Sequence, residues 1–245
     1  MARIQALQRK TVAAERGPRR AAPSLGEIAY ASIKERILAL DLRPGQFVNE
    51  AALCAHLGLG RMPVHQAVHR LMAEGLLDII PRKGIIIGRG SLDEVLDLLE
   101  ARGAVEPNIA ALAAGRATPE QVRAMKRLLE QSGKVIDQRV RGQFMAFDRA
   151  FHHAVAEAAG NRILVDAQRP LHERSILIWH LRIWQADGLA LTQREHQAVL
   201  DAIAARDARG ARAAMQAHLE LLRKRILDGS DAHEIPKARA PGRLG

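Results

Sequence analysis

Four side chains in the second half of the chain have the types and spacing of a metal site. Asp148 and His152 are four residues apart, so on a helix they share one face about one turn apart. His196 and His218 follow on later segments. One carboxylate and three imidazoles suit a borderline divalent ion, zinc first, with nickel or manganese as alternatives. The competing interpretation is that these are surface or hydrogen-bonded core histidines, because the chain has 10 His.

The segments that must position these residues have a helical period from residue 91 almost to the end. Facing helices of a bundle can build a metal site in their core. No segment of this half has the pattern of a strand, so we predict an all-α antiparallel bundle. The predicted helices are Ser91–Ala114, one starting at Thr118-Pro119-Glu120, one at about 140–158, one or two in Asn161–Trp184, then Thr192–Ala205 and Ala208–Leu227.

Residues 49–80 predict two short helices, a tight turn between them, and a strand. Asn49 can cap the first helix, Gly58 can end it, and Pro63 fits the first turn of the second. A second helix with a donor-rich face is typical of a helix-turn-helix DNA reader, and the alternative is an ordinary helical hairpin. Two β-branched strands around Pro81-Arg82-Lys83-Gly84 add a hairpin with two cations at its tip, a wing.

A helix and a short strand predicted before residue 49 complete the helix-turn-helix unit. Ser24–Leu40 is predicted as a helix, with Ser24 and Glu27 in a capping box. Pro44-Gly45 breaks the chain, and Phe47-Val48 is expected to pair with the wing.

Composition is consistent with a polyanionic partner. The net charge is +10 and the pI is about 10.7, which suits nucleic acid. The single cysteine, Cys54, excludes an intramolecular disulfide and a cysteine-based zinc cluster. No apolar run is long enough to span a membrane and there is no secretory h-region, so we expect a cytoplasmic protein.

Residues 26–88 resemble the winged helix-turn-helix of GntR-family transcription regulators. The matching stretches are LDLRPGQFVNEAAL, LGLGRMPVHQAVHRLMAEGLL and PRKGIII. Gly60, Met62, His65 and Gln66 depart from the usual pattern, which concerns the operator sequence more than DNA binding itself. By this resemblance Arg61 and His65 face DNA, and the full predicted DNA-binding set is Arg61, Met62, His65, Gln66, His69, Arg70, Arg82 and Lys83.

Residues 91–230 resemble the FCD ligand-binding domain of the FadR subfamily. The matching stretches are LDLLEARGAVEPNIAALAA, FDRAFHHAVAEAAGN and EHQAVLDAIAARDARGARAAMQAHL. The resemblance places an Asp-x-x-x-His and two later His at the ligand positions named above. It also implies that Arg102 binds the carboxylate of a small organic acid effector; the alternative is an ion pair with Glu100 or Glu106. Three other histidines match no ligand position and are interpreted as ordinary polar residues: His153, His172 and His180.

The predicted fold is therefore mainly α. It comprises a flexible basic arm (1–23), a winged helix-turn-helix (24–90), an all-helical FCD-like effector-binding and dimerisation domain (91–230) and a disordered tail (231–245). We expect a homodimeric repressor that binds double-stranded operator DNA, with an acid effector anchored on a divalent ion. Alternatives are a metalloenzyme, such as a hydrolase, and a direct metal-ion sensor. An enzyme is disfavoured because HExxH is absent and no general base stands beside the ligand set.

Overall fold

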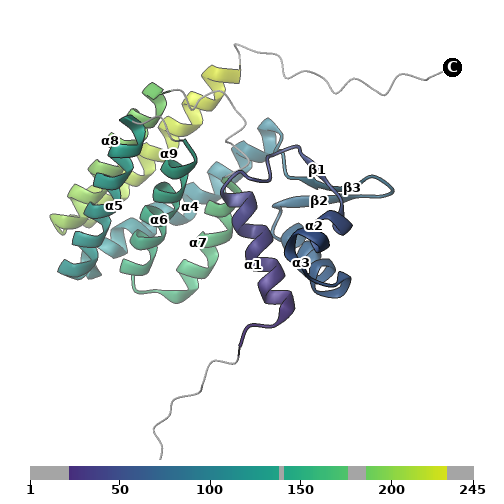
Figure 1. Cartoon of the computed structure of the whole chain (residues 1–245). Coiled ribbons are helices and arrows are strands. Elements are labelled where there is room, and N and C mark those ends of the chain that lie inside the picture. The colour runs from purple at the N-terminus through teal and green to yellow at the C-terminus, as the bar shows by residue number, and fades with distance from the viewer. Residues whose placement is uncertain (1–21, 138–140, 176–185, 231–245) are drawn as a thin grey trace, which may run out of the picture.

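The computed structural model describes residues 22–137, 141–175 and 186–230 (Figure 1). The predicted tail, and the predicted basic arm except for its last two residues, lie outside this range. So does His180, which the sequence interpretation treats as an ordinary polar residue. No helix among the described residues is both long enough and apolar enough to cross a membrane.

The N-terminal part, here called the head, is built from helices α1 (Leu25–Leu38), α2 (Glu50–Leu57) and α3 (Arg61–Ala73). The predicted caps are confirmed. Ser24 and Glu27 form the capping box of α1. Asn49 Oδ1 accepts the Ala52 N–H at 3.0 Å at the start of α2. Gly58 ends that helix with φ of +64°, a conformation that glycine adopts without a steric cost.

A small antiparallel sheet closes the head. Its strands are β1 (Phe47–Val48), β2 (Leu77–Ile80) and β3 (Gly84–Ile87), in the order β1-β3-β2. The predicted pairing of Phe47–Val48 with the wing is confirmed, with Phe47 opposite Ile86. The strand was predicted at Leu76–Ile80 and begins one residue later, at Leu77, because the Leu76 N–H is bonded to the Leu71 carbonyl at the end of α3.

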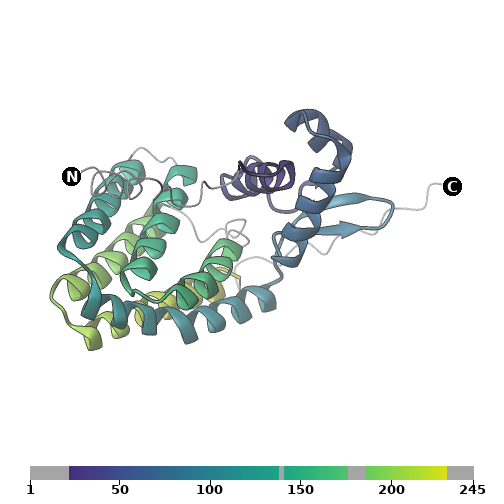
Figure 2. The same cartoon turned by 90° about the horizontal axis from the view of Figure 1, so that it is seen from below.

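The remaining part, here called the body, is helical throughout its described residues, as predicted. Its helices are α4 (Leu92–Arg116), α5 (Pro119–Asp137), α6 (Arg141–Ala158), α7 (Arg162–Arg174), α8 (Ala186–Ala204) and α9 (Ala208–Ser230). They pack side by side as a bundle (Figure 2). The prediction that α8 begins at Thr192 was wrong. Thr192 lies buried inside the helix, where its Oγ1 donates to the Gly188 carbonyl at 3.0 Å.

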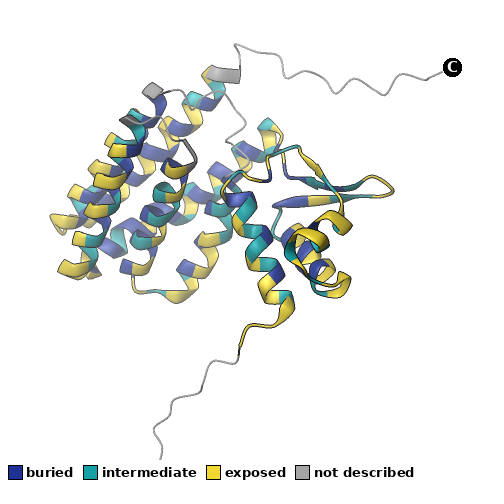
Figure 3. Cartoon of the chain, in the orientation of Figure 1, coloured by how far each residue is buried: buried dark blue, intermediate teal, exposed yellow. Residues whose placement is uncertain are grey.

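Buried apolar residues form one core in the head, which Met145 of α6 joins, and two clusters in the body. Figure 3 shows buried residues in both parts. The main core of the body is rich in alanine, which lets helix backbones approach closely. Its larger buried members include Ile109, Met125, Leu129, Phe151, Val199, Ile203 and Met215.

Several contacts tie α1 of the head to the body. Lys34 Nζ lies 2.9 Å from Glu74 Oε2 within the head and 2.6 Å from Glu173 Oε2 of α7. Arg149 of α6 donates to the Leu38 carbonyl at 2.9 Å. The head is thus connected to the two helices, α6 and α7, whose inner faces carry site residues.

Candidate metal centre and DNA-reading face

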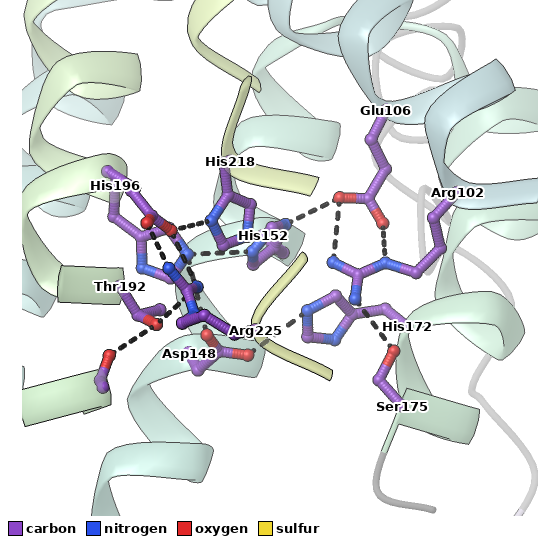
Figure 4. Close-up of polar contacts among 12 residues, drawn as sticks. Arg102, Glu106, Asp148, His152, His172, Ser175, Thr192, His196, His218 and Arg225 are labelled. Atoms are coloured by element: carbon purple, nitrogen blue, oxygen red, sulfur yellow. Dashed lines mark hydrogen bonds and ion pairs between the residues drawn. The ribbon is translucent and has the colours of Figure 1, made fainter. Parts of the chain in front are cut away.

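The four predicted ligands converge in the body. Asp148 and His152 lie on α6, His196 on α8 and His218 on α9 (Figure 4). His152 Nε2 is 3.1 Å from His196 Nε2, which is 3.6 Å from Asp148 Oδ1. One ring nitrogen from each of the three histidines lies within 4.8 Å of the others. The three imidazoles are buried, whereas the Asp148 side chain is 15% exposed.

His172 of α7 is a fifth member of this cluster, which the sequence interpretation missed. Its ring centroid is 4.3 Å from that of His152, and its Nε2 is 3.4 Å from Asp148 Oδ2. Asp148, His152 and His172 form a second group whose donor atoms all lie within 4.8 Å. Interpreting His172 as an ordinary polar residue was therefore wrong. Its neighbours Val165 and Gln168 are also buried at helical spacing, and that inward stripe of α7 was the available signal.

Two carboxylates outside the cluster orient its imidazoles. His152 Nδ1 is 2.8 Å from Glu106 Oε2, and His218 Nδ1 is 2.9 Å from Glu195 Oε2. A carboxylate at this distance holds the proton on Nδ1, so Nε2 of each ring keeps its lone pair for the cluster. Arg225 in turn binds Glu195, with Nη1 at 2.5 Å from Oε1. Such outer carboxylates are the usual partners of metal-ligating histidines.

Arg102 is buried beside these groups. Its Nε donates to Glu106 Oε1 at 2.7 Å, and its Nη1 donates to Ser175 Oγ at 3.0 Å. Of the two alternatives from the sequence, the ion pair with Glu106 is present, and it connects Arg102 to the cluster through His152. Both partners of the pair are 2% exposed.

Burial controls the protonation of the cluster. Burial, and after it the nearby His152 and Arg102, lower the pKa of His172 to about 4, although Asp148 acts in the opposite direction. Burial likewise lowers the pKa of His196 and of His218. It opposes the charge on Asp148, but the neighbouring histidines outweigh it and hold the pKa of that carboxyl below its ordinary value. Burial thus disfavours protonation of His172, His196 and His218, and such imidazoles beside an ionised carboxylate favour the binding of a cation.

Glu106 is ionised for a related reason. Burial disfavours its charge, but Arg102 and His152 outweigh burial and hold the pKa of the carboxyl well below its ordinary value. The donor set therefore fits a borderline divalent ion bound by Asp148, His152, His196 and His218, with His172 within reach.

The predicted DNA-binding residues of α3 lie on its solvent face. Arg61, Met62, His65 and His69 are exposed, and the His65 and His69 rings are 4.4 Å apart. Gly60 precedes the helix and makes no side-chain cap. Arg82 and Lys83 are exposed at the wing turn, where Arg82 has φ of +64°.

Two other residues of the predicted set have partners inside the head. The Arg70 guanidinium stacks over the Tyr30 ring at 3.6 Å and lies 3.4 Å from Glu74. Gln66 is exposed but points toward Gly26 at the start of α1: a Cβ on Gly26 would lie 3.1 Å from Gln66 Oε1. Arg70 therefore stabilises the packing of α1 on α3, in addition to any contact with DNA.

Comparison with protein families matches both parts of the chain. The family described as bacterial regulatory proteins, gntR family, matches residues 25–87, and the FCD domain matches residues 97–221. This chain belongs to the GntR family. The match to an FCD domain fits the FadR-like subfamily, as the sequence predicted. The family consists of transcription regulators, which confirms that the chain is not an enzyme.

Relatives and solved structures agree with this assignment. The chain is 30% identical to a putative L-lactate dehydrogenase operon regulatory protein of Escherichia coli, over 92% of this chain and 94% of that protein. It is 28% identical to the Uxu operon regulator of Haemophilus influenzae, over 86% and 83% of the two chains. The structure of Escherichia coli McbR/YncC superposes with a TM-score of 0.75 at 20% identity, covering 84% of this chain and 99% of that one, which shows a common fold.

Proposed function

We propose that this protein is a transcriptional repressor whose affinity for operator DNA is controlled by a small carboxylate effector bound at a divalent metal ion in the body. The observation that supports the control site best is the convergence of one carboxylate and four imidazoles from four helices, with outer carboxylates on His152 and His218. Zinc suits this set, and nickel or manganese are the alternatives.

The head is proposed to bind DNA through α3 and the wing. Exposed Arg61, His65 and His69 can donate to base edges, while Arg82 and Lys83 neutralise phosphates. We propose a cytoplasmic homodimer that presents two α3 helices to a palindromic operator, with half-sites about one helical turn apart. The net charge of +10 favours such a polyanionic partner.

The body is proposed to hold the effector between the ion and Arg102. Asp148 is the most exposed of the ligands, so open coordination positions on its side are accessible to an acid. Arg102 supplies a fixed guanidinium near the cluster, although an acid must share it with Glu106. The relative named for an L-lactate dehydrogenase operon supports a small hydroxy acid as the class of effector.

The test uses the purified full chain. Elemental analysis and native mass spectrometry are expected to find a stoichiometric divalent ion, and a gel shift at low salt is expected with DNA from upstream of the gene. A folded protein that gives no shift contradicts the DNA-binding half. If added metal alone controls the shift and no organic acid changes it, the protein is a metal sensor and the acid effector is contradicted.

A further inference from the structure

A pocket opens between α6 and α7, on the side of the body that adjoins α1. Its volume is about 300 Å³, at the lower end of the range for small-molecule sites. The polar residues lining it are Arg149, His153, Gln168, Arg169, His172 and Glu173. The lining holds two guanidinium groups and one carboxylate, and a second carboxylate, Asp166, lies 3.8 Å from Arg169. Guanidinium groups that line a pocket can bind an anionic ligand.

The pocket adjoins the metal cluster through His172. The His172 side chain is 6% exposed, and its Nε2 has no hydrogen-bond partner within 3.5 Å in suitable geometry. Its nearest charged neighbour is Asp148 Oδ2, 3.4 Å away. This nitrogen faces Asp148, so the His172 ring forms the wall between the pocket and the metal cluster.

The same pocket holds the residues that bind the head. Arg149 donates to the Leu38 carbonyl at the C-terminal end of α1 at 2.9 Å. Glu173 lies 2.6 Å from Lys34 Nζ, in the C-terminal half of α1. A ligand in this pocket therefore meets two polar side chains of the body that bind α1.

We propose that this pocket is an outer subsite for a carboxylate of the effector, with Arg169 as its recognition residue and Arg149 as the residue that transmits occupancy to the head. The inference rests on the proposed function, because it takes the effector to be a small organic acid. A carboxylate is a stronger acceptor for a guanidinium than a neutral carbonyl is. Binding therefore draws Arg149 away from Leu38 and loosens the C-terminal turn of α1.

Acid binding and the attachment of α1 to the body are coupled, and this coupling is reciprocal. If an acid weakens the attachment of α1, then attachment of α1 weakens acid binding by the same factor. The head is consequently free to change its orientation when the acid is bound, which changes how two heads fit two half-sites.

Calorimetry on the full-length, zinc-loaded protein tests the subsite, with acetate, lactate, succinate and citrate as probes. Arg169→Gln is expected to weaken the tightest-binding acid by about tenfold or more, since a charge-assisted hydrogen bond is lost. Arg162→Gln is the matched control. Arg162 lies on the same helix and, like Arg169, beside Asp166, at 3.9 Å and 3.8 Å respectively. Its side chain is 95% exposed and does not line the pocket. This control is expected to bind like the wild type.

Hydrogen exchange gives a second readout that does not depend on a variant. Saturating acid is expected to speed exchange in the last turn of α1, around Leu38, and to leave α9 unchanged. Equal acid affinity in Arg169→Gln and wild type, unchanged exchange in α1, or no binding by any acid of the series overturns the subsite. If an acid still alters DNA affinity while Arg169→Gln has no effect, the proposed function stands and the subsite falls. If acid binding depends on Arg169 but the protein does not bind DNA, the subsite stands and the proposed function falls.

Discussion

The head and the body use polar side chains in opposite ways. In the head, the residues proposed to bind DNA, such as Arg61 and His65, are exposed on a helix whose other face is apolar. In the body, Arg102, Glu106 and the clustered histidines are buried, and each depends on the others for its charge or its hydrogen bonds. An exposed polar residue can change at little cost in stability. A buried network cannot, because removal of one member leaves its partner unpaired.

The largest expected effect comes from the buried pair. Glu106→Ala leaves Arg102 as an unpaired buried charge and His152 without its acceptor, so we expect a loss of about 3–5 kcal/mol in the free energy of unfolding. Urea denaturation followed by circular dichroism measures it. The control is Glu100→Ala, an exposed carboxylate on the same helix, expected to change stability by less than about 0.5 kcal/mol. Equal effects would contradict the buried network.

Loss of a metal-binding side chain should lower the affinity of the body for the ion. His196→Ala removes one of the four buried imidazoles of the cluster, so the affinity for zinc should fall by more than the roughly 10–100-fold that loss of an outer partner produces. Chelator competition and elemental analysis measure this. His153→Ala, a change to an exposed neighbour of His152, should keep wild-type metal content. Unchanged metal in His196→Ala would show that the ligand assignment is wrong.

In the head, the substitution expected to affect DNA binding most directly is Arg61→Ala. If Arg61 binds a base edge, operator affinity should fall by about 1–3 kcal/mol while the fold stays intact. Fluorescence anisotropy at fixed salt measures it. Arg223→Ala, which removes an exposed arginine from α9 of the body, serves as the control and should bind DNA like the wild type. Wild-type affinity in Arg61→Ala would remove this residue from the DNA-binding surface.

The cap of α2 gives a smaller effect. Asn49→Ala removes the acceptor for the Ala52 N–H, so the head should lose about 1 kcal/mol of stability. Thermal unfolding of the head, observed by hydrogen exchange in α2 and α3, reports it. A variant as stable as the wild type would show that water replaces the cap at no cost.

The smallest effect concerns the N-terminus of α3. Gly60 has φ of −67° and no heavy atom within 4 Å of an added Cβ, so Gly60→Ser introduces no clash. A serine there can cap α3, and we expect a gain of a few tenths of a kcal/mol. A clear loss of stability would mean that the turn before α3 needs glycine for a reason that its geometry does not show.

The two regions also differ in how much of them the sequence could predict. The start of α1, the caps of α2 and the wing follow from local signals at Ser24, Asn49, Gly58 and Arg82-Lys83, and these were confirmed as structural elements. Neighbouring residues in the chain determine such features. Residue spacing was therefore sufficient for the head.

In the body, spacing placed Asp148 and His152 on one face but could not show what α7 and α4 bring to them. His172 was missed because its position depends on how α7 is rotated against α6, which no local pattern encodes. The choice between Glu100 and Glu106 as the partner of Arg102 was left open for the same reason. The start of α8 was misplaced at Thr192, which is buried inside the helix and bonded to the Gly188 carbonyl one turn earlier.

The central claim is that the metal cluster of the body controls the affinity of the head for DNA. Anisotropy of the zinc-loaded full chain on DNA from upstream of the gene, repeated with saturating lactate or citrate and after chelation, tests it most directly. We expect the affinity for DNA to change by about 5–150-fold with one of the acids, and the change to be absent in His196→Ala. DNA affinity that stays the same with every acid and after chelation would contradict the claim.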